Sequence, residues 1–365
     1  MISIDSIAGK VRSGERLSDA DALFLFRSDE LAALGELAAE KNAQFNGNRV
    51  FFNVNRHVNY TNICRNHCRF CAFRRDPGEP GAYLLDLERI LGLAADAAAH
   101  GATEIHLVGG LHPDLPFEAY LDMLKGLKSR SPGLHLKAFT AVEIDHLSSI
   151  SGLPVPVALE KLRQAGLDSI PGGGAEIFAE PVRARLCSDK ISGARWLEIM
   201  EQAHRSGLRS NATMLYGHIE AHADRVDHMK RLRELQDRTG GFQAFIPLLF
   251  QPGNSPLGLD APAERGGADD LKTVAVARLY LDNFDNIKAY WIMLGEKIAQ
   301  AALAFGANDL DGTVVEEKIG HEAGAGSPRG MGRDEIERLI RLAGRVPVER
   351  DSLYSPTLSL DGEGT

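Results

Sequence analysis

The sequence predicts an α/β protein built as a (β/α)8-type barrel, or as an incomplete version of one. From about Val50 onward, apolar runs rich in β-forming residues alternate with amphipathic helical stretches, each pair taking roughly thirty to forty residues. Such alternation indicates parallel strands joined by helices. Eight strands can be placed, and a count above six favours a barrel over a doubly wound open sheet, which the same alternation would also fit. A chain of 365 residues is long enough for a barrel with extensions at both ends.

A helical preface precedes the barrel, because apolar residues recur at helical spacing from Leu17 to Lys41. Strands are expected at residues 50–55, 104–108, 134–139, 167–170, 209–215, 242–246, 287–293 and 307–310. Helices are expected at residues 87–100, 117–129, 157–165, 194–206, 223–239, 269–283 and 295–305. We therefore divide the chain into an N-terminal helical extension (1–46), a barrel domain (47–320), and a C-terminal helix and tail (321–365) that packs on the barrel.

Composition and charge narrow the classes of partner. Hydrophobic residues make up 44% of the chain, which is typical of a globular protein with a large core. The formal net charge of -9 repels a polyphosphate backbone, so no nucleic-acid partner is expected. The first residues lack the apolar run of a signal peptide, and no stretch approaches the ~18 apolar residues of a membrane span. We expect a cytoplasmic protein with no membrane partner.

Three of the four cysteines are clustered directly after the first expected strand. Cys64, Cys68 and Cys71 have the spacing C-x3-C-x2-C, whereas Cys187 stands alone and is expected to be a small buried residue. In a reducing compartment such a cluster indicates a metal site rather than a disulfide. Three thiolates at this spacing can bind three corners of a cubane cluster and leave the fourth iron without a protein ligand.

Two other classes of protein compete with this interpretation. One is a structural zinc site with His57 or His67 as fourth ligand, although zinc sites usually contain two C-x2-C pairs and this chain has one. The other is an iron–sulfur electron carrier, which would usually have four cysteine ligands and a small fold.

Glycines follow two further strands at the end where barrels place functional groups. Gly109 and Gly110 close the second strand, and Gly173 lies in the string PGGGAE after the fourth, where glycine lets the backbone approach a ligand closely. The second string could also cradle a phosphate, but no Lys-Ser or Lys-Thr follows it as in a P-loop. Shortly after it, Arg183 offers a two-pronged guanidinium for a carboxylate.

The fifth expected strand carries polar residues that a barrel would turn inward. Asn211 and Thr213 share one face, and polar residues inside a barrel usually line a ligand. Tyr216 and His218 follow in the loop above the pocket, although a core histidine is an equally good interpretation of His218. Lys288, near a later strand, is the second candidate cation for a substrate carboxylate.

The string C-x3-C-x-aromatic-C after the first barrel strand resembles the signature of the radical S-adenosylmethionine enzymes. In that family the open iron of a [4Fe-4S] cluster binds S-adenosylmethionine, and an electron from the cluster breaks its C–S bond to give an adenosyl radical. The resemblance implies that Cys64, Cys68 and Cys71 hold the cluster and that Phe70 packs beside the adenine. Gly109 and Gly110 match the glycines of the family's GGE-like position, where this chain has Leu111 in place of the acid.

The remaining candidates are divided between the two ligands of such an enzyme. For S-adenosylmethionine we expect Gly173 to allow close approach, Glu176 to bind the ammonium or the ribose hydroxyls, and Arg183 and Asn211 to add polar contacts. The substrate or catalytic candidates are Thr213, Tyr216, His218 and Lys288.

Within the superfamily, the chain resembles the radical enzymes of menaquinone and deazaflavin biosynthesis. Strings such as GGLHPDLPFEAY and NDLDGTVVEEKIGHEAG carry this resemblance, which is closest to the aminofutalosine synthase family. Cyclic dehypoxanthine futalosine synthases typically have SPPE-like and SWVTQG-like strings where this chain has TAVE at 140–143 and YWIM at 290–293. That family and the deazaflavin synthases remain the alternatives.

The resemblance to the aminofutalosine synthase family implies a transferase that adds the adenosyl radical to 3-[(1-carboxyvinyl)oxy]benzoate. The aryl group then migrates from oxygen to carbon, and loss of a carboxylate leaves 6-amino-6-deoxyfutalosine. S-adenosylmethionine is thus a co-substrate, and flavodoxin or ferredoxin is the expected kind of electron donor.

Overall fold

The main sheet of the computed structural model, which describes residues 2–259 and 266–357, is parallel and seven-stranded. Its strands lie in chain order, so each pairs with the next one formed along the sequence. They are β2 (Asn55–Val58), β3 (Glu104–Leu107), β4 (His135–Ala138), β5 (Ser169–Ile170), β6 (Arg209–Tyr216), β7 (Phe242–Leu249) and β8 (Asn286–Ile287). The sheet curls into a partial barrel of the TIM type, which confirms the predicted fold class. Part of the expected C-terminal region, residues 358–365, lies outside the described residues.

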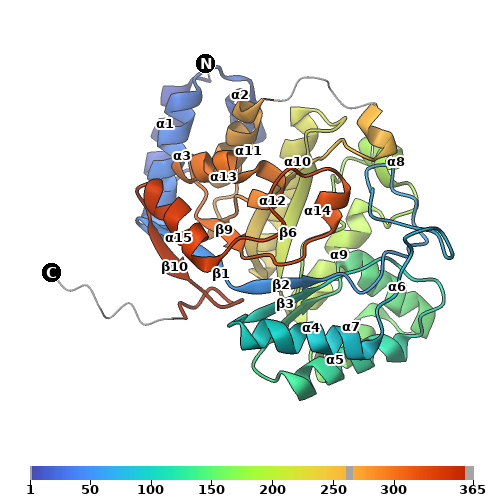
Figure 1. Cartoon of the computed structure of the whole chain (residues 1–365). Helices are drawn as coiled ribbons and strands as arrows, with labels where there is room; N and C mark the ends of the chain where they lie inside the picture. The colour runs from blue at the N-terminus through green and yellow to red at the C-terminus, as the bar shows by residue number, and fades with distance from the viewer. Residues whose placement is uncertain (1, 260–265, 358–365) are drawn as a thin grey trace.

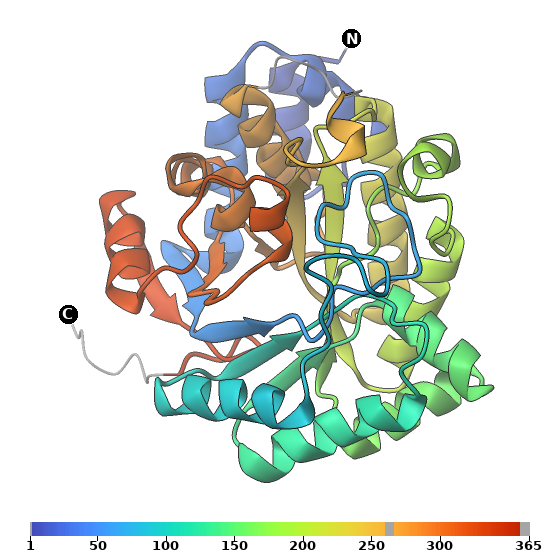
Figure 2. The same cartoon turned by 45° about the vertical axis from the view of Figure 1, so that its right-hand side comes forward.

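Helices follow the strands, and the longer of them cover the outside of the curled sheet (Figures 1 and 2). They are α4 (Leu87–Ala99), α5 (Phe117–Arg130), α6 (Ala141–Ser151), α7 (Val155–Ala165), α8 (Glu180–Cys187), α9 (Gly193–Arg205), α10 (His222–Thr239), α11 (Gly267–Tyr280), α12 (Trp291–Leu294), α13 (Glu296–Ala302) and α14 (Ile319–Glu322), with short 3-10 turns at Pro256–Leu259 (η1) and Leu303–Phe305 (η2). Helices α6 and α8 were not predicted. Helix α6 has a weak apolar stripe, but its capping box of Thr140 and Glu143 is a local signal that fixes its start.

A second, three-stranded sheet corrects the first predicted strand. The run 50–55 is two strands, because β1 (Arg49–Asn53) pairs with β9 (Asp309–Gly312) on one side and β10 (Val346–Glu349) on the other, while β2 pairs with β3. The predicted strand 287–293 is also wrong beyond Ile287, since the chain turns there into α12 and the indole of Trp291 donates to the Gly312 carbonyl at 2.9 Å.

The segment 308–315 spans the space between the two ends of the main sheet. The amide of Asn308 donates to the Ile287 carbonyl beside β8 at 3.0 Å, and the amide of His57 in β2 donates to the Val315 carbonyl at 3.1 Å. Asp311, Val314 and Glu316 have positive φ angles of 70°, 47° and 64°. Residues with side chains adopt such angles only where the surrounding structure holds them, and they are frequent near functional sites.

The predicted helical extension consists of α1 (Ile4–Ser13), which was not predicted, α2 (Asp19–Arg27) and α3 (Leu31–Asn46). Helix α2 lies beside α10 and α11, α3 lies beside α11, and α1 packs on α3 (Figure 1). Asp19 of α2 accepts a hydrogen bond from the Tyr280 hydroxyl at 2.6 Å and pairs with Lys230 at 3.0 Å. At the other end of the chain, α15 (Arg333–Leu342) leads into β10. Among the described residues, no helix combines the length and apolar character needed to cross a membrane.

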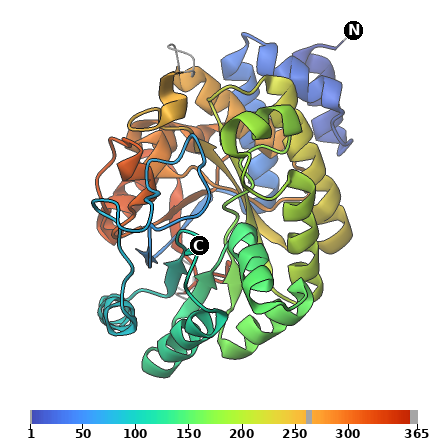
Figure 3. The ribbon, with the colours of Figure 1, turned by 90° about the vertical axis from the view of Figure 1, so that its right-hand side faces the viewer.

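Between β2 and α4 the chain forms one long connection that contains the three clustered cysteines. Figures 2 and 3 show this segment, in blue, running across the middle of the molecule. It is tied to the end of β3, because the amide of Gly110 donates to the Thr61 carbonyl at 2.9 Å and the amide of Arg65 donates to the Leu111 carbonyl at 3.0 Å. The connection is therefore positioned over the carboxyl ends of the strands, where α/β barrels place their sites.

Candidate functional site

A cavity of about 300 Å³ lies under the cysteine segment, inside the curl of the sheet. Its walls come from that segment, from the ends of β3, β4, β6 and β7, and from the segment 308–315. The predicted site residues that line it are Cys64, Cys68, Cys71, Phe70, Gly109, Gly110, Gly173, Glu176, Asn211 and Thr213. The other four, Arg183, Tyr216, His218 and Lys288, are not part of the lining.

The three clustered thiols face this cavity, and all four cysteines are free. Burial raises the pKa of the Cys68 thiol to about 12, although the nearby ammonium of Lys190 acts in the opposite direction. A bound cation would be needed to hold this sulfur as a thiolate. Cys187 is 2% exposed and does not line the cavity.

The donor set fits a multi-iron cluster better than a single zinc ion. Within residues 2–259 and 266–357, no group of three or more His, Cys, Asp or Glu side chains could hold one metal ion. The cysteines of a cubane bind separate irons and need not converge on one point. His67, a proposed fourth zinc ligand, is exposed and lies 3.4 Å from Asp189 instead.

Lys190, which the sequence analysis missed, lies between two of the predicted residues. Its ammonium is 2.5 Å from Glu176 and 5.0 Å from the centroid of the Phe70 ring. Burial alone would lower the pKa of Lys190, but the nearby Cys68 and Glu176 outweigh burial and raise it. The lysine follows α8 without any motif, so no local signal could have identified it.

Glu143, also missed, holds the backbone at the end of β3. One carboxylate oxygen accepts hydrogen bonds from the Tyr60 hydroxyl at 2.8 Å and the Gly109 amide at 3.0 Å, while the other accepts from Thr140. Burial raises the pKa of this carboxyl group. The capping box that starts α6 was the available signal.

At Gly109 and Gly110, neighbouring atoms of the protein leave no room for a side chain, so glycine is required there whether or not a ligand binds. A Cβ on Gly109 would lie 2.7 Å from the Tyr60 ring, and a Cβ on Gly110 would overlap the Ile63 carbonyl and come within 2.9 Å of the Cys64 Cβ. These glycines let the cysteine segment pack directly on the end of β3.

Arg183 requires a correction. Its guanidinium is buried and donates to backbone carbonyls, at 2.7 Å to Ala175, 2.6 Å to Ile191 and 3.2 Å to Gly174. The predicted contact with a ligand carboxylate does not fit this position, because the donors already fix the backbone of the PGGGAE turn.

Arg183→Met should therefore lower stability rather than ligand affinity alone. Removing the guanidinium leaves several buried carbonyls without donors, which should cost on the order of 3 kcal/mol. Thermal unfolding followed by circular dichroism would measure the loss. Arg185→Met, on an exposed position of the same helix, is the control and should unfold at the temperature of the unaltered protein.

Tyr216, His218 and Lys288 also lie behind the cavity wall. The Tyr216 hydroxyl donates to Asp270 at 2.8 Å, and the imidazole of His218 contacts the Leu215 carbonyl at 3.0 Å and Glu220 at 2.9 Å. Lys288 is bonded at 2.5 Å to Asp311, which does line the cavity. These contacts correct the direct substrate roles predicted for the three residues.

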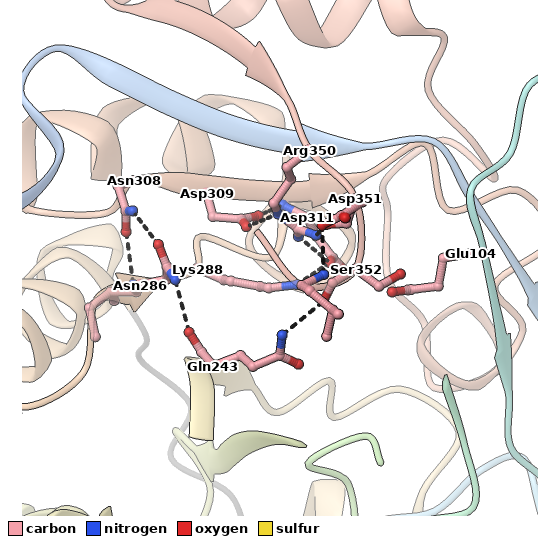
Figure 4. A network of polar contacts seen from close by, with 12 residues as sticks. Glu104, Gln243, Asn286, Lys288, Asn308, Asp309, Asp311, Arg350, Asp351 and Ser352 are labelled. Carbon is pink, nitrogen blue, oxygen red and sulfur yellow. Dashed lines mark hydrogen bonds and ion pairs between the residues drawn. The ribbon is translucent and has the colours of Figure 1, made fainter. Parts of the chain in front are cut away.

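The floor of the cavity, opposite the cysteine segment, is polar. Its lining includes His57, His106, Tyr290, Asp311 and Glu317. Beneath it lies the buried network shown in Figure 4, in which Lys288 reaches Asp311, and Arg350 donates to Asp309 at 2.8 Å.

Comparisons with known proteins agree with this geometry. Residues 58–232 match the family model described as "Radical SAM superfamily", and residues 239–360 match "CofH/MqnC C-terminal region". An aminodeoxyfutalosine synthase of Thermus thermophilus is 48% identical over 95% of this chain and 94% of its own length. A 5-amino-6-(D-ribitylamino)uracil–L-tyrosine 4-hydroxyphenyl transferase of Methanopyrus kandleri is 46% identical over 87% of both chains.

Among solved structures, methylornithine synthase is similar in fold. The two structures have a TM-score of 0.74 at 19% identity, over 93% of this chain and 97% of that one. Membership of the superfamily implies a [4Fe-4S] cluster and S-adenosylmethionine. Because two family models match in succession and relatives near half identity span most of the sequence, the chain belongs to the radical SAM enzymes that have a CofH/MqnC C-terminal region.

Proposed function

We propose that this enzyme catalyses the aminodeoxyfutalosine synthase reaction of menaquinone biosynthesis. It would join the adenosyl group of S-adenosylmethionine to 3-[(1-carboxyvinyl)oxy]benzoate. The observation that carries the proposal is the 48% identity to the Thermus thermophilus enzyme, which extends over 95% of this chain. One cavity is lined both by the three cysteines and by the polar residues of its floor, and both reactants would share that space. This arrangement supports the proposal.

In this proposal Cys64, Cys68 and Cys71 hold the cluster. When bound, the cluster supplies the electron that generates an adenosyl radical from S-adenosylmethionine. Phe70 and Lys190 lie beside these thiols and would pack against the adenine, while Glu176 would accept hydrogen bonds from the ammonium or ribose hydroxyls. Asn211 and Thr213 project from β6 into the same space.

The middle of the cavity would protect the reacting carbons from water. Its walls are formed there by the apolar side chains of Val108, Leu215, Ile246 and Leu248. An apolar wall excludes water and offers no competing polar partner. The vinyl carbon would bond to the adenosyl carbon in this region, after which the aryl group moves from oxygen to carbon. The carboxylate of the carboxyvinyl group then leaves as carbon dioxide with release of one electron, which balances the electron used to cleave S-adenosylmethionine.

Isotopic labelling tests this reaction. With the enol ether labelled with ¹³C in its carboxyvinyl carboxylate, anaerobic turnover should release the label as carbon dioxide or bicarbonate. The adenine-containing product should have the mass of 6-amino-6-deoxyfutalosine, and free 5'-deoxyadenosine should be a minor product. Mass spectrometry measures both. Stoichiometric 5'-deoxyadenosine with unchanged enol ether, or turnover of dehypoxanthine futalosine instead, would contradict the assignment.

The second candidate is the transfer of a hydroxyphenyl group from tyrosine. The 46% identity to the Methanopyrus kandleri enzyme favours it over other members of the superfamily. Consumption of L-tyrosine with 5-amino-6-(D-ribitylamino)uracil, in the absence of the enol ether, would identify this activity.

A further inference from the structure

Two histidines lie side by side on the cavity floor. His57 of β2 and His106 of β3 are register partners, so their side chains point to the same face of the sheet, and their ring centroids are 4.4 Å apart. His57 is 6% exposed, and its Nε2 is buried without a hydrogen-bond partner. His106 contacts the His57 ring, and its ring nitrogens form no hydrogen bond with the described residues. A buried polar nitrogen without a hydrogen-bond partner destabilises the protein, so this position is not explained by packing alone.

The charges around this histidine pair cancel one another. The ammonium of Lys137 and the carboxylate of Glu104 are 2.5 Å apart, as are those of Lys288 and Asp311. Glu317 lies 3.3 Å from His321, and its hydrogen bond to that ring raises the pKa of His321 to about 9. Beneath them, Arg350 is paired with Asp309, as Figure 4 shows.

Both rings of the histidine pair are therefore neutral when no anion is bound. Burial lowers the pKa of His57. The nearby carboxylates of Glu317, Asp311 and Glu104 oppose this effect but do not cancel it. Burial also lowers the pKa of His106, and the neighbouring His57 lowers it further. The floor presents uncharged imidazoles inside a set of balanced ion pairs.

The cavity has no free permanent cation at this end among the described residues. Its lining contains one arginine and one lysine, Arg74 and Lys190, and both come from segments that pack around the cysteines. Each already has a carboxylate partner, Asp76 for Arg74 and Glu176 for Lys190. The proposed substrate has two carboxylates, and one of them remains in the product on the aromatic ring.

We propose that His57 and His106 form the subsite that binds the aromatic carboxylate of the substrate. This inference rests on the proposed function and adds the orientation of the substrate. One N–H group from each imidazole would donate to the carboxylate oxygens on the side of the ring that lines the cavity. With the carboxylate held at the floor, the vinyl group points toward the cysteine end, where the adenosyl group is expected.

Binding by this histidine pair should take up a proton. An anion beside a neutral imidazole favours its protonated form, so the imidazole pKa rises on binding. Affinity should therefore be highest below neutral pH and fall as the pH rises through the imidazole pKa of the complex. The charged groups that face the histidine pair are themselves in ion pairs: Lys137 with Glu104, Lys288 with Asp311, and Glu317 with His321.

Calorimetry on the reconstituted enzyme with 3-methoxybenzoate, which has the aromatic carboxylate and no vinyl group, tests this subsite. Titrations in phosphate and in Tris at one pH report the protons exchanged, because the two buffers differ in ionisation enthalpy. We expect net proton uptake by the unaltered enzyme. His57→Gln and His106→Gln should each weaken binding at least about tenfold, as expected for the loss of a charge-assisted hydrogen bond, and should reduce the uptake. Uncharged 3-methoxybenzamide should bind without proton uptake and with little difference between variants.

His146→Gln is the matched control, because His146 is also 6% exposed but lines a neighbouring pocket and not this cavity. It should leave the affinity for 3-methoxybenzoate and the proton uptake unchanged. Iron content and circular dichroism confirm that each variant is folded. If His57→Gln does not fold, His106→Gln alone decides, since its ring nitrogens bond to no described residue.

The outcomes separate this subsite from the proposed function. Absence of 3-methoxybenzoate binding, unchanged affinity in His106→Gln, or equal affinity for the benzamide would overturn the subsite, whatever product the enzyme makes. Conversely, histidine-dependent binding of the benzoate by an enzyme that yields no adenosylated product would leave the subsite in place and refute the proposed reaction.

Discussion

Cys68→Ala is expected to lose its iron and all detectable activity, and Cys64→Ala and Cys71→Ala should behave in the same way. The three thiols are the cysteine side chains that line the cavity, and a cubane with only two protein ligands lacks a corner attachment. Cys68 is 7% exposed and makes part of the core, so removal of its sulfur should also loosen the segment slightly. Iron and sulfide content, with the visible absorbance of the reconstituted protein, measure the effect.

Cys187→Ala is the control for that series. This thiol is buried near Cys68 but outside the cavity lining, so iron content and turnover should stay close to those of the unaltered enzyme. A protein that keeps its iron without Cys64, Cys68 or Cys71, but loses it without Cys187, would refute the proposed ligand set.

Gly110→Ala should have the second largest effect, although it adds one methyl group. The new Cβ would overlap the Ile63 carbonyl and press on the Cβ of Cys64, and both atoms belong to the cysteine segment. Backbone cannot move aside as a flexible side chain can, so the position of Cys64 must shift. Iron content and binding of S-adenosylmethionine should fall together while the barrel remains folded.

Gly92→Ala provides the comparison for this substitution. Gly92 lies within α4, and a Cβ there meets no atom within 4 Å. Alanine favours a helix over glycine by about 1 kcal/mol, so this variant should be as stable as the unaltered protein or slightly more so. Iron retained at the normal level in Gly110→Ala would show that the segment tolerates the shift.

The sequence was sufficient to predict those parts of the fold that are determined locally. Strands β3, β4, β6 and β7 overlap the predicted strands, because each alternates with helical stretches along the sequence and needs no distant partner to be placed. The run 50–55 was misinterpreted as one strand, because the change of partner at Val54 depends on β9 and β10, hundreds of residues away.

In the candidate site, too, the residues within one local motif could be predicted, and those brought together by the fold could not. The cysteines could be predicted because their spacing within one segment is itself the signal. His57, His106 and Lys190 come from separate segments and acquire a shared cavity only in the fold. Arg183 was assigned to a ligand because a sequence shows the charge of a guanidinium and not the carbonyl groups that surround it.

The position of β1 has a consequence for how the chain is made. This apolar strand lies between β9 and β10, and Arg49 pairs with Val346, so its partners leave the ribosome about 300 residues later. At 5–20 residues per second, both edges of β1 stay open for roughly 15–60 s during synthesis. An open apolar edge recruits strands from other nascent chains. The pairing of residues 49–53 must therefore wait until translation is nearly complete.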